Sequence, residues 1–123
     1  MHDESVTEGP HPLGFNDEWL RLEIVSTERI RELLDEYETG EDPNPEHYRW
    51  RAFVSFLDQQ PTLSEAKLVS LYRLGESDPH VAMGESMMNK ILQRADCPLA
   101  LLEEAAASNV AHLVRIARRR LDR

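Results

Sequence analysis

The chain has 123 residues, of which 41% are hydrophobic and 30% charged, and its formal net charge is −9. This length suits one domain with one ordinary core. No apolar run reaches the ~18 residues that a membrane span requires. The N-terminal segment "MHDESVTEGPHPLG" has neither the basic nor the apolar region of a secretory signal, so we expect a cytoplasmic protein with no membrane partner.

The charge is unevenly distributed. Residues 1–46 carry fourteen acidic residues against three arginines, whereas the other 77 residues carry nine acidic and eleven basic ones. An acidic protein repels phosphate backbones at long range, which disfavours nucleic acid and favours a basic protein as partner. Residues 1–14 are polar and acidic and have nothing to bury. They are expected to form a disordered acidic arm, followed by a single helical domain over residues 15–123.

The first patterned segment, "EWLRLEIV" at residues 18–25, has two interpretations. Its alternating apolar residues are typical of a strand, but no second strand is predicted anywhere to pair with it. Asn16, followed by two acidic residues, suits the start of a helix. We favour a helix and leave the state of residues 19–25 open.

Start and stop signals then divide the chain into short helices. After Ser26 a helix is predicted that ends at Gly40, and Asn44 with Pro45 begins another that ends before Pro61. Four further helix starts are predicted from a capping box and from short polar side chains. They are Thr62 with Glu65, Asp78 before Pro79, Asp96, and Ser108 or Asn109. In the helix after Pro79, the predicted buried stripe is Val81, Gly84, Met88, Ile91 and Ala95.

The helices recur in pairs. "QQPTLSEAKLVSLYRLGESDPHVA" aligns with "QRADCPLALLEEAAASNVAHLV" at an offset of about 33 residues, a length typical of stacked helix pairs. Over residues 62–121 the pattern resembles HEAT and armadillo repeats, particularly the bacterial leucine-rich repeat variant. In that variant a Cys/Pro–Leu–Leu helix is followed by a Ser-Asn or Ser-Asp corner and a Val-Arg helix. The resemblance implies a small α-solenoid of a kind that mostly binds other proteins. The chain departs from it in lacking an Ala-Asn-Pro corner.

The sequence shows no enzyme, cofactor or metal signature. Its histidines never stand three to five residues apart, and "DPNPE" fails as a calcium loop where Gly and Glu are needed. Cys97 follows Asp96 at a predicted helix start, where the helix dipole lowers a thiol pKa. A nucleophile also needs a base and an orienting group, which the sequence does not place beside it. A structural role is favoured for Cys97.

Three groups of residues are candidates for a partner surface. Arg115, Arg118 and Arg119 belong to a C-terminal cluster, for which a solvated helix face is the favoured interpretation. Docking on acidic surfaces is the next interpretation, and nucleic-acid binding the last, since no aromatic residue lies within residues 73–123 for base stacking. For Met83 and Met87, packing in the core is the favoured interpretation and docking of a partner is the second. For Trp50 and Phe56, burial in the middle of the domain is the favoured interpretation and a dimer contact is the second.

These observations predict an all-α protein of short antiparallel helix pairs, stacked as a small HEAT-like solenoid or an irregular helical bundle. The predicted function is a non-enzymatic protein–protein interaction or adaptor module. The alternatives are a homodimeric regulatory or chaperone-like protein and, less favoured, a nucleic-acid binder through the C-terminal arginines.

Overall fold

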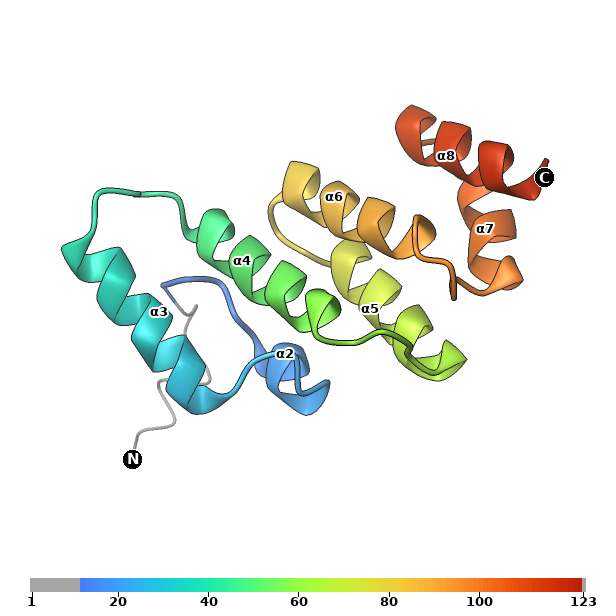
Figure 1. Cartoon of the computed structure of the whole chain (residues 1–123). Helices are drawn as coiled ribbons and strands as arrows, with labels where there is room; N and C mark the ends of the chain where they lie inside the picture. The colour runs from blue at the N-terminus through green and yellow to red at the C-terminus, as the bar shows by residue number, and fades with distance from the viewer. Residues whose placement is uncertain (1–11, 123) are drawn as a thin grey trace. The chain divides into compact units, whose positions relative to one another are not determined.

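The structure, a computed structural model, describes residues 12–122 (Figure 1). In this range the chain forms α-helices and no strand, so the prediction of an all-α fold is confirmed. The helices are α2 (Asp17–Arg21), α3 (Thr27–Thr39), α4 (Pro45–Asp58), α5 (Glu65–Glu76), α6 (Val81–Leu92), α7 (Leu99–Ala106) and α8 (Ala111–Leu121). They fall into an N-terminal unit, Met1–Pro61, and a C-terminal unit, Thr62–Arg123, where the sequence had predicted one domain from residue 15.

The N-terminal unit uses residues that were assigned to the disordered arm. Leu13 is fully buried, and its carbonyl oxygen accepts a 2.7 Å hydrogen bond from Nη1 of the buried Arg49. The prediction is therefore wrong for residues 12–14, because one apolar side chain there reaches the core. The rest of the predicted arm lies outside the described residues.

Helix α2 is a single turn around Trp19. The Asn16 side chain accepts from the backbone N–H of Glu18 at 3.0 Å, as the predicted helix start requires. The Trp19 ring meets the rings of Phe15 and Phe53 edge-on, at centroid distances of 5.0 and 6.2 Å. Such edge-to-face pairs stabilise a core beyond the area they bury.

The segment after α2 settles the ambiguity of "EWLRLEIV". The helix ends at Arg21, and Glu23 then adopts a φ of 60°, which residues with a Cβ rarely occupy. This left-handed residue turns the chain so that Ile24 and Val25 are both buried. The segment is therefore helical only at its start and then a turn, and not a strand.

Helices α3 and α4 form the helix pair of the N-terminal unit. Ser26 caps α3 by accepting from the backbone N–H of Arg29 at 3.0 Å. Gly40 ends α3 as predicted, although its φ of −93° is extended and not left-handed. Pro45 occupies the first turn of α4. The rings of Tyr37 and Tyr48 meet edge-on at 5.6 Å between the two helices.

Helices α5 and α6 pack most closely where two glycines face each other. A Cβ added at Gly84 would lie 2.3 Å from the carbonyl oxygen of Gly75, and one added at Gly75 would lie 2.9 Å from that of Gly84. These distances are below normal contact, so the helices approach each other through backbone atoms at this point. The close approach fixes the crossing of the first helix pair of the C-terminal unit.

Two predicted caps of this pair are displaced by two residues. Ser64, and not Thr62, caps α5 by accepting from the backbone N–H of Lys67 at 3.1 Å. At α6 the cap is His80, whose Nδ1 accepts from the backbone N–H of Met83 at 3.2 Å. Asp78 accepts instead from the backbone N–H of His80, at 3.0 Å, and so shapes the loop that precedes the cap.

The second helix pair, α7 and α8, is tied to α6 and to the start of α5. Asp96 was predicted to cap α7, but its carboxylate pairs with Arg94 and accepts from the backbone N–H of Leu63 at 2.9 Å. Arg120 donates to the carbonyl oxygens of Leu92 and Arg94, at 2.7 and 3.0 Å, and so satisfies the C-terminal end of α6. Pro98 and Val110 occupy the cap positions of α7 and α8 without a side-chain hydrogen bond.

Candidate functional site

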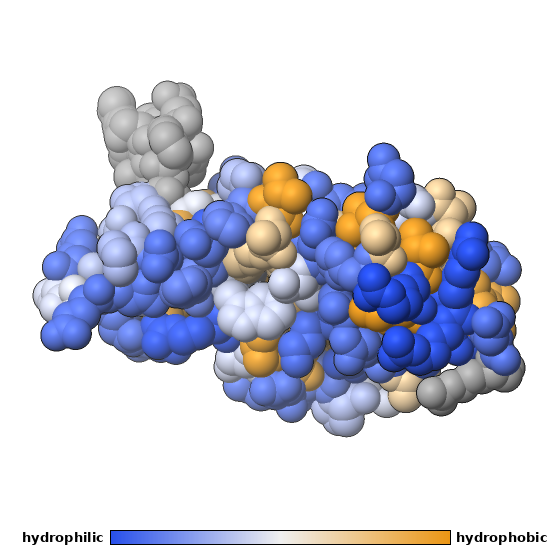
Figure 2. All heavy atoms as spheres, turned by 90° about the horizontal axis from the view of Figure 1, so that it is seen from above, coloured by the Kyte–Doolittle hydropathy of each residue, from blue (hydrophilic) through white to orange (hydrophobic). Residues whose placement is uncertain are grey.

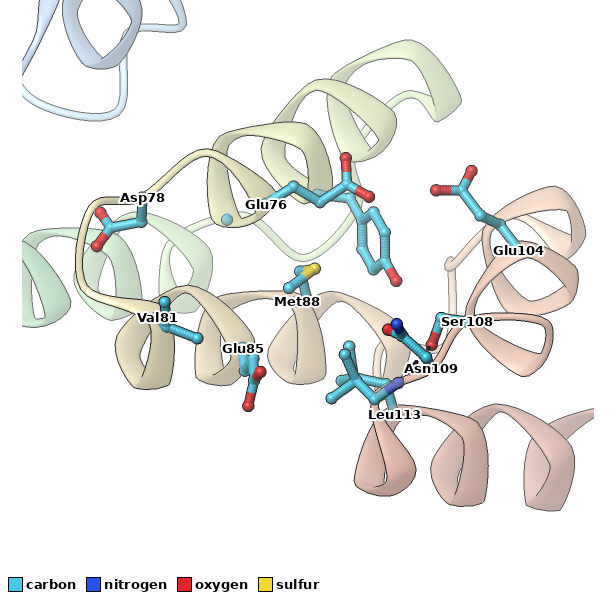
Figure 3. A pocket seen from close by; sticks show the side chains of 12 residues that line it. Glu76, Asp78, Val81, Glu85, Met88, Glu104, Ser108, Asn109 and Leu113 are labelled. Carbon is cyan, nitrogen blue, oxygen red and sulfur yellow. Dashed lines mark hydrogen bonds between the residues drawn. The ribbon is translucent and has the colours of Figure 1, made fainter.

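A groove of about 370 Å³ opens in the C-terminal unit (Figure 3). Its apolar lining comes from four side chains, Tyr72, Met88, Val110 and Leu113, together with Val81 at one side. Its acidic lining comes from Glu76, Asp78, Glu85 and Glu104. None of its lining residues is basic. We call it the acid-rimmed groove.

Four helices position these side chains. Tyr72 and Glu76 lie four residues apart on the last turns of α5, so they share one face. Val81, Glu85 and Met88 are successively four and three residues apart on α6, which also places them on one face. Helix α7 contributes its acidic side chain from the second turn, and the α7–α8 corner and the first turn of α8 complete the lining.

Val81 departs from its predicted place in the buried stripe. It is 69% exposed, and the buried face of α6 runs instead through Met83, Gly84, Met87, Met88, Ile91 and Leu92. Ala95 lies beyond the end of α6 and is exposed. Val81 and Leu99 are the most exposed large apolar side chains of residues 12–122. Figure 2 shows such apolar surface (orange) interspersed with hydrophilic side chains.

Arg73 connects α5 to α7 beside the groove. Its guanidinium donates to both carboxylate oxygens of Glu104 and, at 3.0 Å, to Glu76. These hydrogen bonds raise the pKa of Arg73, and the same guanidinium lowers the pKa of the Glu104 carboxyl. Two of the four lining carboxylates, Glu76 and Glu104, share this one guanidinium, so acidic side chains outnumber basic ones around the groove.

Glu85 has a weaker counter-ion than Glu104. Its closest cationic partner in the described chain is Nε2 of His112, at 3.8 Å, which carries charge only when the ring is protonated. No lysine or arginine within residues 12–122 pairs with Glu85. The α6 side of the groove therefore carries a carboxylate whose ionic partner within residues 12–122 is a histidine ring and not a lysine or arginine.

Tyr72 is the least expected member of the groove. Its side chain is 2% exposed, yet its hydroxyl makes no hydrogen bond to any part of the described chain. Burial, followed by the charges of Glu104 and Glu76, raises the pKa of this hydroxyl to about 12, so it stays protonated and remains a donor. Buried tyrosine hydroxyls usually find a partner, so a donor with no acceptor in the described chain is unusual.

The structure does not bring the sequence-predicted surface residues together. Met83 and Met87 are 5% and 0% exposed, which corrects their assignment to a partner surface and agrees with core packing, the favoured interpretation. They lie on the face of α6 that packs on α5, where Met87 lies beside Gly75. Trp50 and Phe56 are partly buried on α4, in the N-terminal unit, where the Trp50 ring stacks on Phe53.

The arginine cluster of α8 divides into two kinds of residue. Arg115, Arg118 and Arg119 are exposed, as a solvated helix face predicts. Arg120, in contrast, is partly buried and holds the end of α6. Arg123 lies outside the described residues.

Cys97 does not have the properties of an activated thiol. Burial raises its pKa to about 11, against a smaller opposite effect of Arg120. The residue lies before α7 and outside the acid-rimmed groove. This direction is opposite to the lowering that a helix N-terminus can produce. Across residues 12–122, no three His, Cys, Asp or Glu side chains form a group that could hold a metal ion.

Sequence reasoning missed the groove because its residues gave no local signal. Tyr72 and Met88 have the spacing of ordinary core residues, and Val81 was assigned to the core. The one available signal was the repeat itself, since residues of its aligned Ser-Asp and Ser-Asn corners, Asp78, Ser108 and Asn109, all line the groove.

The fold and the groove define an all-helical protein of short packed helix pairs. None of its described helices is both long and apolar enough to cross a membrane. Comparison with known protein families, curated proteins and solved structures finds no significant match to this chain.

Proposed function

We propose that the chain is a non-enzymatic protein-interaction module, built from HEAT-like helix pairs, that binds its partner in the acid-rimmed groove. The solenoid interpretation is supported by the packing of the C-terminal unit. Helix α5 packs on α6, α7 packs on α8, and the second helices α6 and α8 pack on each other. Arg73 bridges the first helices, α5 and α7. In solenoids each repeat packs mainly on its neighbours in this way.

One combination of features carries the proposal. In the same groove, the 69% exposed Val81 offers apolar surface, and the buried Tyr72 hydroxyl offers an unused donor. The exposed valine leaves apolar area in contact with solvent, and the Tyr72 hydroxyl has no acceptor among residues 12–122. A peptide laid in the groove relieves both, since it covers the valine and presents carbonyl oxygens to the hydroxyl.

Peptide display on the immobilised full-length chain tests this function. We expect a library of random short peptides to yield a set sharing a common pattern. Binding of that set should be lost in Val81→Lys and kept in Leu99→Lys. Leu99 is the matched control because it is 60% exposed and apolar but lies outside the groove, and both variants change the net charge equally. Peptides that bind both variants as they bind the parent, or no enriched peptides at all, would contradict the proposal.

A further inference from the structure

We infer that the partner segment is cationic as well as apolar: a lysine- or arginine-bearing peptide that places an apolar side chain against Val81 and a backbone carbonyl against the Tyr72 hydroxyl. This inference rests on the proposed function and specifies the chemistry of its partner. It draws on three separate properties of the groove, namely its charge, its apolar lining and its unused donor.

The charge of the groove is complementary to that of a cationic segment. Four carboxylates line the groove, no basic residue does, and Arg73 neutralises only part of that charge. An anionic segment would meet repulsion on α5, α6 and α7 alike. A cationic one gains from Glu85, whose ionic partner among the described residues is a histidine, and is attracted by the overall charge of −9.

The apolar lining and the donor exclude a purely ionic partner. Val81 and the edges of Met88 and Val110 provide nothing for a hydrated ammonium group to bind. The Tyr72 hydroxyl is a neutral donor and requires an acceptor, which every peptide backbone supplies. A polyamine satisfies the charges but offers neither an apolar side chain nor a carbonyl oxygen.

Fluorescence anisotropy with three labelled probe peptides tests the inference on the full chain. The probes are a lysine–leucine peptide, its glutamate–leucine counterpart and a lysine–serine peptide of the same length. We expect only the lysine–leucine probe to bind, and its affinity to fall with added salt. Val81→Lys should lower the affinity for the lysine–leucine probe at least about tenfold, and Leu99→Lys should leave it unchanged. This comparison separates binding in the groove from general attraction to an acidic surface.

Two conservative substitutions examine the individual contacts. Glu85→Gln should lower the affinity for the lysine–leucine probe about threefold. Glu103→Gln is the same change at an exposed site on α7 outside the groove, and it should leave the affinity unchanged. Tyr72→Phe should weaken binding of the probe about fivefold while leaving the melting temperature equal or higher, because the hydroxyl makes no hydrogen bond within residues 12–122. A merely structural tyrosine would instead lose stability on this change.

The outcomes separate this inference from the proposed function. If the glutamate–leucine probe binds as well as the lysine–leucine probe, or if Glu85→Gln has no effect, the cationic partner is refuted. The Val81-dependent peptides from display would still support an interaction module. If light scattering shows a dimer that Val81→Lys abolishes, a second copy of the chain fills the groove and the inference fails. Equal loss of the probe in Val81→Lys and Leu99→Lys also refutes it.

Discussion

The close contact between α5 and α6 leads to a quantitative prediction for Gly84→Ala. The added Cβ would lie 2.3 Å from the carbonyl oxygen of Gly75, whereas carbon–oxygen contacts normally begin at about 3.3 Å. The shortfall of about 1 Å is against backbone, which cannot rotate away as a side chain can. The two helices must therefore separate or shift along each other.

The expected cost follows from two opposing effects. Overpacking of this kind costs about 1–3 kcal/mol, and the upper end applies where the obstacle is backbone. Alanine in place of glycine inside a helix recovers about 1 kcal/mol. Gly84→Ala should therefore lower the free energy of unfolding by about 2 kcal/mol, which lowers the melting temperature by about 10 °C in a domain of this size.

Urea and thermal unfolding followed by circular dichroism at 222 nm provide the measurement. Tryptophan fluorescence is less suitable, since both tryptophans lie in the N-terminal unit. Ser86→Ala is the control for helix propensity, because Ser86 is exposed on the same helix. Gly75→Ala should have a smaller effect than Gly84→Ala, since its Cβ would meet backbone at 2.9 Å. A Gly84→Ala protein as stable as the parent would refute the close contact as described.

Three other substitutions or conditions give measurable outcomes. Glu23→Gly should raise the free energy of unfolding by about 0.5–1 kcal/mol, because glycine adopts a φ of 60° without strain. Glu23→Ala keeps the strained backbone and should not raise it, and urea unfolding distinguishes the two variants. The hydrogen bond with Arg94 lowers the pKa of Asp96 to about 2. The stability that this carboxylate adds to the folded state is therefore fully present above its pKa in the unfolded chain, ~3.9, and is lost as the pH falls toward 2. Asp96→Asn should remove about 1 kcal/mol of that acid-sensitive stability after solvent screening, and an unchanged slope of stability against pH below 4 would contradict this. Arg120→Ala should cost about 1.5–3 kcal/mol by leaving the end of α6 unsatisfied, and Arg119→Ala, on the exposed face, should change the melting temperature little.

The positions of the helices were largely determined by the sequence, because a helix start depends on hydrogen bonds within four residues. Asn16 caps α2 as predicted, α3 begins directly after Ser26, and Pro45 begins α4. Where two capping residues stood close together, as at Thr62 and Ser64, the local signal could not choose between them. The helical class of the protein followed from these local rules.

The candidate site was decided by the tertiary structure alone. Val81 and Met83 are two residues apart on α6, and only the direction in which α5 and α8 approach decides that the first is exposed and the second buried. The Tyr72 hydroxyl is an unused donor because helices from both pairs surround it without offering an acceptor. Such properties depend on contacts between residues some thirty positions apart, as with Arg120 and Leu92, and no local pattern encodes them.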